Sequence, residues 1–261
     1  MERMGIDVSH WNGSINWNLV QKSGIDFAIL KCMYEAKSHR IDETFEANYR
    51  NAGAMGIARG VYIFIASASI ADPQGDANAL LKHLNGRPLE YGIWLDLEAS
   101  VLRNQGKDKI KELAYIYAGI FRAAGYYCGI YCNKDWYDNV IHEDLKKDFE
   151  FWIARYPRND VGAYNKNSSL RPSYTTAVAW QYSSKGKVEG ISGNVDLDVD
   201  YDGVVKLIAK EPYKKTNKEI AKEVLEGKWG TKNTNPSREK LLTMAGYDYK
   251  AIQKIVNDWL K

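Results

Sequence analysis

The chain has 261 residues, of which 45% are apolar and 12% aromatic, and its net charge at pH 7 is +3. This length allows one barrel-sized domain, or a domain of about 200 residues followed by a small module. The charge is too small to indicate a nucleic-acid-binding protein, and no apolar stretch reaches the ~18 residues that a membrane span needs.

Apolar runs alternating with amphipathic segments predict the elements of the larger part. The expected strands cover residues 4–8, 25–33, 57–66, 91–98, 126–132, 149–156 and 177–183, followed by a hairpin over 188–197 that ends in another strand. The expected helices cover residues 15–22, 42–55, 73–84, 107–124 and 202–209, with Asp42 and Asp202 as N-caps. This alternation predicts a parallel sheet and an α/β fold, and about eight strands fit a closed (β/α) barrel.

The composition changes near residue 210. Residues 210–261 carry 12 Lys and Arg against 7 Asp and Glu, a net charge of +5, which leaves −2 for the remainder. Residues 210–217 are typical of a linker, and caps and apolar stripes predict short helices over 218–226, 235–246 and 248–260. We therefore expect a catalytic-sized domain over residues 1–209 and a small three-helix bundle over residues 218–261.

The stretch over residues 91–98 has two acids at the end of an apolar run. On a strand, Asp96 and Glu98 share one face with Trp94. Two like charges this close raise one of the two pKa values, and a raised pKa suits a general acid at neutral pH. We expect Asp96 to ionise first. Asp7 and Asp196 stand at the ends of other expected strands, and closing the barrel brings the first and last strands together, so the sequence predicts a carboxylate active site at one mouth.

Other chemistries fit the sequence less well. Asp198 opens a pattern similar to a calcium loop, but Ala209 stands where the closing Glu is required. Ser9 and His10 are too close to Asp7 in sequence to form a reliable triad, and the four histidines lack metal-ligand spacing. Clustered acids also serve phosphoryl transfer, but no phosphate-binding loop is found. We predict no metal site and no cofactor, and buried free thiols for the three cysteines, Cys32, Cys128 and Cys132.

An ordered set of short motifs resembles the glycoside hydrolase family 25 lysozymes over about residues 4–208. The motifs are Gly5-Ile6-Asp7-Val8-Ser9, Gly60-Val61-Tyr62-Ile63-Phe64, Trp94-Leu95-Asp96-Leu97-Glu98, Phe151-Trp152-Ile153-Ala154, Trp180-Gln181-Tyr182 and Val195-Asp196. The resemblance implies an irregular, TIM-type barrel of the β5α3-like kind. It also implies N-acetylmuramidase activity on the MurNAc-β-1,4-GlcNAc bond of peptidoglycan.

The resemblance also implies roles for individual residues. Glu98 resembles the acid/base, and Asp96 its partner, which holds charge or orients the N-acetyl group of the substrate. Asp7 and Asp196 resemble the two further acids of that site. Residues expected to contact substrate are Tyr62, Trp180, Lys31, Trp152 and Phe64. The chain departs from the family at Ile63, where the family often has His.

The C-terminal segment resembles a small three-helix cell-wall-binding repeat of phage lysozymes, here in a single copy. Trp229 is a candidate to stack on a sugar, and Arg238 to bind a carboxylate of the muropeptide. The expected partner is bacterial peptidoglycan, with no nucleic acid and no membrane insertion; the oligomeric state stays open. Because no apolar signal-peptide region opens the chain, we expect a phage endolysin made in the host cytoplasm and released through a holin.

Two other functions remain compatible with the sequence. One is a non-catalytic protein that binds the cell wall or another glycan on the same barrel. The other is an N-acetylglucosaminidase or chitinase. The presence of all four acids, Asp7, Asp96, Glu98 and Asp196, favours the muramidase over the non-catalytic alternative.

Overall fold

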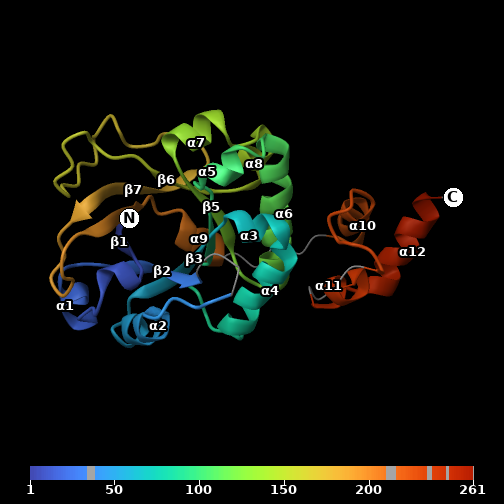
Figure 1. Cartoon of the computed structure of the whole chain (residues 1–261), viewed down its shortest axis with the longest axis horizontal. Helices are drawn as coiled ribbons and strands as arrows, with labels where there is room; N and C mark the ends of the chain where they lie inside the picture. Colours follow the sequence, from blue (N-terminus) through green and yellow to red (C-terminus); the bar gives the residue numbers. More distant parts are fainter. Residues whose placement is uncertain (34–38, 210–215, 234–236, 245–246, 261) are drawn as a thin grey trace.

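The computed structural model describes residues 1–33, 39–209, 216–233, 237–244 and 247–260. Its larger part is a closed barrel of eight strands in chain order, surrounded by helices, and three further helices follow at the C-terminal end (Figure 1). The strands are β1 Arg3–Val8, β2 Phe27–Met33, β3 Ala58–Phe64, β4 Ile93–Asp96, β5 Cys128–Asn133, β6 Phe151–Ala154, β7 Ala177–Gly186 and β8 Val195–Asp200. The predicted α/β barrel is confirmed.

Helices lie between the strands along the chain and after the last strand. They are η1 His10–Asn12, α1 Trp17–Lys22, α2 Phe45–Ala54, α3 Ser67–Ala71, α4 Pro73–Leu84, α5 Ser100–Arg103, α6 Lys107–Ala123, α7 Lys134–Asn139, α8 Glu143–Asp148 and α9 Val204–Ala209. Helix α6 buries Ile110, Leu113, Tyr117 and Phe121, which recur every three or four residues along one face. No helix in the described ranges combines the length and apolarity that a membrane span requires.

The alternation of side chains along each strand divides the barrel into an outer and an inner core. On β4, Ile93 and Leu95 belong to the outer core beneath the helices, and Trp94 belongs to the inner core. The Trp94 ring lies 5.8 Å from the ring of Trp152 on β6, which is not a neighbouring strand, so both side chains point into the barrel. This inner core supports the mouth of the barrel from below.

Strand β8 runs against the expected parallel direction. Strands β1 to β7 are parallel along the barrel, whereas β8 is antiparallel to both β7 and β1. The connection from β7 to β8 spans only residues 187–194 and holds no helix. So short a connection can only reverse the chain, because a parallel pair needs a crossover of a dozen or more residues.

Two predicted helix caps are wrong. Helix α2 begins at Phe45, and Asp42 instead accepts hydrogen bonds from the Thr44 backbone N (3.0 Å) and from His10. Before α9, it is Asp200 Oδ1 that accepts from the backbone N of Gly203 (3.1 Å), while Asp202 pairs with Lys206 (2.8 Å). The three cysteines are buried free thiols, as predicted.

The C-terminal helices form a small core of their own. They are α10 Asn217–Leu225, α11 Arg238–Met244 and α12 Tyr249–Trp259. The helix predicted over residues 235–246 has its expected cap at Asn235, its start at Pro236 and its stop at Gly246, and these three residues lie outside the described ones. The core consists of Ile220, Ala221, Val224, Trp229, Leu242, Ile252 and Val256. Ile120 and Ala123 of α6 pack against this core, so the small bundle touches the barrel.

Candidate active site

Four carboxylates converge at one mouth of the barrel. Asp7 on β1 lies directly across from Asp196 on β8 in the strand register. Asp96 ends β4, and Glu98 follows two residues later, beyond the strand. Each acid interacts electrostatically with at least one other: Asp7 with Asp96 and Asp196, and Glu98 with Asp96 and Asp196.

Asp196 reaches this mouth from the opposite direction to the one predicted. The sequence predicts the acids at strand C-terminal ends, but Asp196 is the second residue of β8. Because β8 is antiparallel, its beginning lies at the same mouth as the ends of β1 and β4. The predicted convergence therefore holds, and the strand direction behind it is corrected.

A cavity of about 260 Å³ opens beside two of these acids, Asp7 and Asp196. It is lined by Asp7, Val8, Ser9, Trp11, Asn12, Tyr62, Asn194, Val195 and Asp196. Trp11 stands at its rim with 84% of its surface exposed. An exposed aromatic ring beside buried acids can stack on a flat apolar ligand face, such as that of a sugar ring.

Burial raises the pKa of both acids at the end of β4. Asp96 is 6% exposed, and its pKa is raised well above the usual value, first by burial and then by the charge of Glu98, against the opposing charge of Lys31. The Glu98 side chain reaches solvent, yet desolvation by the surrounding protein still raises its pKa. Burial acts on both acids, and the order in which Asp96 and Glu98 ionise stays a prediction.

The other two acids are shifted in the same direction. Burial raises the pKa of Asp7 well above its usual value, and the charges of Asp196 and Asp198 add to this, while a hydrogen bond from Gln181 opposes it. Burial, followed by the charges of Glu98 and Asp160, raises the pKa of Asp196 to about 6. The mouth can therefore hold protons near neutral pH, which is what a general acid requires.

The residues expected to contact substrate fall into two groups. Tyr62 lines the cavity, and the Lys31 ammonium lies 6.0 Å from the ring centroids of Tyr62 and Phe64. Trp180 is 2% exposed in the outer core and donates to the Arg155 carbonyl (2.9 Å), so it faces away from the cavity. Trp152 is 3% exposed in the inner core. Strand alternation explains the correction for Trp180, since its neighbour Gln181 takes the inward position.

Sequence reasoning missed a polar network beneath the acids. The Gln181 amide donates to Asp7 Oδ2 (2.5 Å), and its carbonyl oxygen accepts from the hydroxyls of Tyr131 (2.8 Å) and Tyr156. Trp152 Nε1 donates to Asp198 Oδ1 (2.8 Å). The available signal was Gln181 itself, a polar residue inside an apolar run whose buried amide needs partners.

The loop after β1 holds Trp11 in place. His10 Nδ1 lies 2.8 Å from Asp42 Oδ2, and the His10 and Trp11 ring centroids are 4.5 Å apart. Ligand atoms of His10, Asp42 and Glu43 lie within 4.8 Å of one another, so this group could geometrically approach a metal ion. Asp42 already accepts from Thr44 and His10, and the group therefore serves as a brace for the loop.

The candidate wall-binding residues of the small bundle are engaged within it. Trp229 is 8% exposed and donates to Glu223 Oε2 (2.9 Å), so its ring packs in the core and offers no open face to a sugar. The Arg238 guanidinium donates to the Gly230 carbonyl (2.8 Å from Nη2) and to Gln253 Oε1 (3.2 Å from Nη1). These contacts correct the stacking role expected of Trp229.

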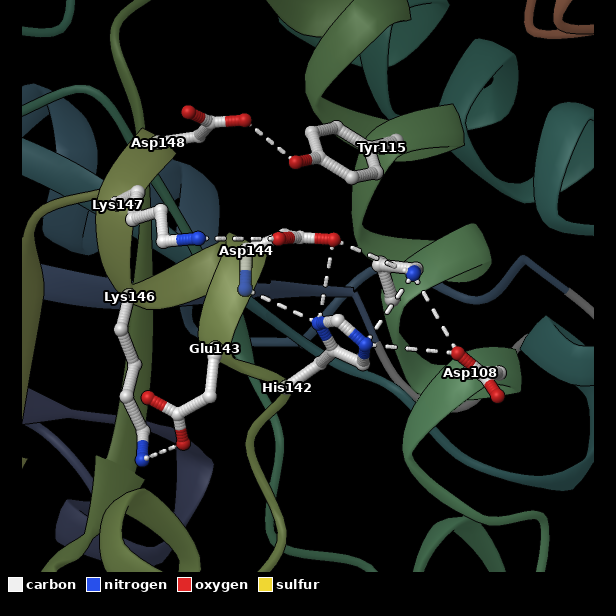
Figure 2. A network of polar contacts seen from close by, with 9 residues as sticks. Asp108, Tyr115, His142, Glu143, Asp144, Lys146, Lys147 and Asp148 are labelled. Carbon is white, nitrogen blue, oxygen red and sulfur yellow. Dashed lines mark hydrogen bonds and ion pairs between the residues drawn. The ribbon is translucent and has the colours of Figure 1, made fainter.

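A second cluster of acids lies between α6 and α8, on the outside of the barrel (Figure 2). Lys111 Nζ lies 3.4 Å from both Asp108 Oδ1 and Asp144 Oδ2, and 3.2 Å from His142 Nε2. The hydrogen bond from Lys146 lowers the pKa of Glu143. These acids carry cationic partners and are exposed, which is typical of a solvated surface network.

Comparison with known proteins identifies both parts of the chain. The family model described as glycosyl hydrolases family 25 matches residues 6–191, and that of the CW_7 repeat matches residues 218–260. Lysozyme M1 of Streptomyces globisporus is 30% identical over 214 residues, which cover 78% of this chain and 70% of that protein.

Two solved structures extend the similarity to the fold. The CTP1L endolysin superposes with a TM-score of 0.63 at 26% identity, covering 85% of this chain and 78% of the endolysin. The lysozyme of Streptomyces coelicolor superposes with a TM-score of 0.59 at 27% identity, covering 79% of this chain and 95% of that lysozyme.

Proposed function

The chain belongs to glycosyl hydrolase family 25, and from this premise we propose that it is an N-acetylmuramidase that cleaves the MurNAc-β-1,4-GlcNAc bond of bacterial peptidoglycan. The observation that carries the proposal is the group of four acids, Asp7, Asp96, Glu98 and Asp196, at one mouth of the barrel. Glycoside hydrolysis requires an acid that is protonated near neutral pH and a carboxylate that stabilises a cationic transition state.

Glu98 is our candidate for the acid. Its side chain reaches solvent at the mouth, so it can approach the glycosidic oxygen, and its raised pKa keeps a proton available. Asp96 lies buried behind it and orients the substrate or holds charge. Asp7 and Asp196 line the cavity and add negative potential there, which stabilises a developing positive charge on the sugar ring.

The cavity walls support a sugar substrate. Tyr62 and the exposed Trp11 line the same cavity as Asp7 and Asp196, and aromatic rings provide stacking faces for sugar rings. Lys31 and Phe64 continue this wall past Tyr62. We place the sugar chain across this wall, with the bond to be cleaved next to Glu98.

Analysis of products from purified cell wall tests the proposal. New reducing ends on MurNAc support the muramidase. New reducing ends on GlcNAc indicate an N-acetylglucosaminidase, and binding without new ends indicates a non-catalytic glycan-binding protein. Glu98→Gln is the matched control, because it keeps the size of the side chain and removes the proton donor.

We also propose that residues 1–209 form the catalytic barrel and that residues 218–261, joined by a linker over 210–217, retain it on the wall. The match to the CW_7 repeat and the separate small core support this division. Arg238 is the candidate ligand contact, provided that its guanidinium exchanges its internal partners for a carboxylate of the muropeptide. We further propose that the chain is a phage endolysin released through a holin; the similarity to the CTP1L endolysin supports the endolysin role.

A shortened chain tests the division. A chain that ends at Ala209 should still cleave small soluble muropeptides and lose activity on intact walls, because the bundle raises the local concentration of the barrel at its polymer. The contact of Ile120 and Ala123 with the bundle makes a stability control necessary. Equal loss on both substrates from a folded barrel would show that the bundle is part of the catalytic unit.

A further inference from the structure

The inward face of β8 carries an acid that the proposed mechanism does not use. Asp198 is 0% exposed and stands in register with Gly5 on β1 and Gln181 on β7. Its neighbour on the same strand face, Asp196, opposes Asp7. A carboxylate buried this deeply is costly unless it is paired and hydrogen-bonded.

The two oxygens of Asp198 have different partners. Oδ1 accepts from Trp152 Nε1 at 2.8 Å. Oδ2 is buried and receives no hydrogen bond from a donor in the described part of the chain. Asp7 stands diagonally across the register of β1 and β8 from Asp198, and each of the two carboxyl groups affects the pKa of the other. Two carboxyl groups can share a hydrogen bond only if one of them carries a proton, and such a proton satisfies the orphaned oxygen.

Asp7 is fixed from its other side. The Gln181 carbonyl oxygen accepts from two hydroxyls, those of Tyr131 and Tyr156, so the orientation of the amide is determined and its NH₂ group faces Asp7. Gln181 thus donates to Asp7 Oδ2 and leaves the rest of the Asp7 carboxyl for Asp198. The Asp7 carboxyl group therefore lies between Gln181 and Asp198.

In the described part of the chain, the polar groups found around the pair are neutral or acidic. They come from six strands and the segment after β6: Tyr62 (β3), Asp96 (β4), Tyr131 (β5), Trp152 (β6), Tyr156 (after β6), Gln181 and Tyr182 (β7), and Asp196 (β8). Two full negative charges at this depth would therefore repel each other without compensation.

We propose that Asp7 and Asp198 hold one proton between them, so that Asp198 is a positioning residue that keeps Asp7 aimed at the mouth with a single negative charge. The role of Asp198 in catalysis rests on the proposed function. The shared proton depends only on the interior of the barrel. The proton belongs to the pair and not to either residue alone. Asp198 touches no substrate and acts through Asp7.

The first test compares three variants of the full chain. Asp198→Asn keeps the bond from Trp152 and offers an NH₂ group to Asp7, so it imitates the protonated state and should retain kcat near that of the wild-type chain. Asp198→Leu removes both bonds and should lower kcat by about 10- to 100-fold through misplacement of Asp7. Asp200→Asn is the matched control, because Asp200 lies on the same strand and bonds to Tyr91 (3.1 Å) instead of Asp7.

The second test uses thermal unfolding of Asp198→Asn between pH 4 and pH 9. Burial raises the pKa of Asp198 and of Asp7, so the folded pair keeps a proton that the unfolded chain releases, and the wild-type chain loses stability as pH rises through the folded pKa. The unfolding temperature of Asp198→Asn relative to wild type should therefore increase with pH.

The outcomes separate the two proposals. The shared proton would be overturned if the difference in unfolding temperature between Asp198→Asn and the wild-type chain did not change with pH. It would also be overturned if kcat were as low in Asp198→Asn as in a folded Asp198→Leu protein. If Asp198→Leu does not fold, the pH series of Asp198→Asn decides alone. If the wild-type chain releases no fragments from cell wall, the proposed function fails, and the unfolding series still tests the pair.

Discussion

The molecule has two clusters of acids with opposite environments. At the barrel mouth, Asp96, Asp7 and Asp196 are mostly buried, and burial raises the pKa of each. Between α6 and α8, the acids are exposed and paired with lysines, and Glu143 has a lowered pKa because Lys146 donates to it (Figure 2).

The difference shows how one residue type serves two purposes. A carboxylate beside an ammonium is stabilised in its charged form and cannot hold a proton at neutral pH. A carboxylate that is desolvated among other acids keeps its proton, at a cost in stability.

The largest expected effect follows from removing the proton donor. Glu98→Gln should lower turnover on purified peptidoglycan by about 10²–10⁴-fold, the usual scale of general acid catalysis. The variant should keep the unfolding temperature of the wild-type chain at low pH, where the protonated Glu98 is as neutral as the glutamine that replaces it. Release of reducing ends at a near-wild-type rate by a folded Glu98→Gln protein would remove Glu98 from the mechanism.

The next effect concerns the order of ionisation within the Asp96 and Glu98 pair. Asp96→Asn should lower kcat by roughly 10- to 100-fold, because the carboxyl group that orients the substrate is replaced. Because burial raises the pKa of Glu98, the pH at which activity falls on the alkaline side should stay in place. A shift of this pH by about one unit or more would mean that the Asp96 charge controls Glu98.

A smaller effect is expected on stability. The pKa of Asp196 is raised to about 6, so the folded state binds a proton that the unfolded state has released, and the wild-type chain loses stability as pH rises from the ordinary value of 3.8 through about 6. Asp196→Asn should raise the free energy of unfolding by on the order of 2 kcal/mol at pH 7 and leave it unchanged at pH 3. Equal effects at both pH values in chemical denaturation would contradict this account.

The smallest effect is expected in the surface cluster. Glu143→Gln should leave activity unchanged, because Glu143 lies on α8 outside the barrel. Its pKa is lowered, so any stabilisation it provides is present above the ordinary value and is lost as pH falls through the folded pKa, opposite in sign to Asp196. Unfolding curves of the two variants over one pH range compare these signs directly.

The fold was predictable where one pattern dominated. Apolar alternation located the strands, and Ile93, Trp94 and Leu95 took the inner and outer positions that a period of two requires. The all-parallel sheet was wrong at β8, although a hairpin over residues 188–197 was expected before that strand. The length of residues 187–194 carried the information on strand direction.

The candidate site was predictable as a set of residue types and less so in its contacts. The convergence of Asp7, Asp96 and Asp196 followed from strand ends and barrel closure. Trp180 was expected to contact substrate, but its neighbour Gln181 takes the inward position, because side chains one residue apart on a strand lie on opposite faces. Asp198 lies near Asp7, which is distant from it in sequence, and no local sequence pattern indicates that the two acids are neighbours.

Titration of individual carboxyl groups by carbon-13 NMR in the full chain tests the central claim most directly. The account predicts that Asp196 titrates at about 6, that Glu98 titrates above its ordinary value of 4.5, and that Glu143 titrates below 4.5 in the same sample. If Glu98 and Asp196 instead titrate at or below their ordinary values, the barrel mouth does not hold protons as described, and the assignment of Glu98 as the acid is contradicted.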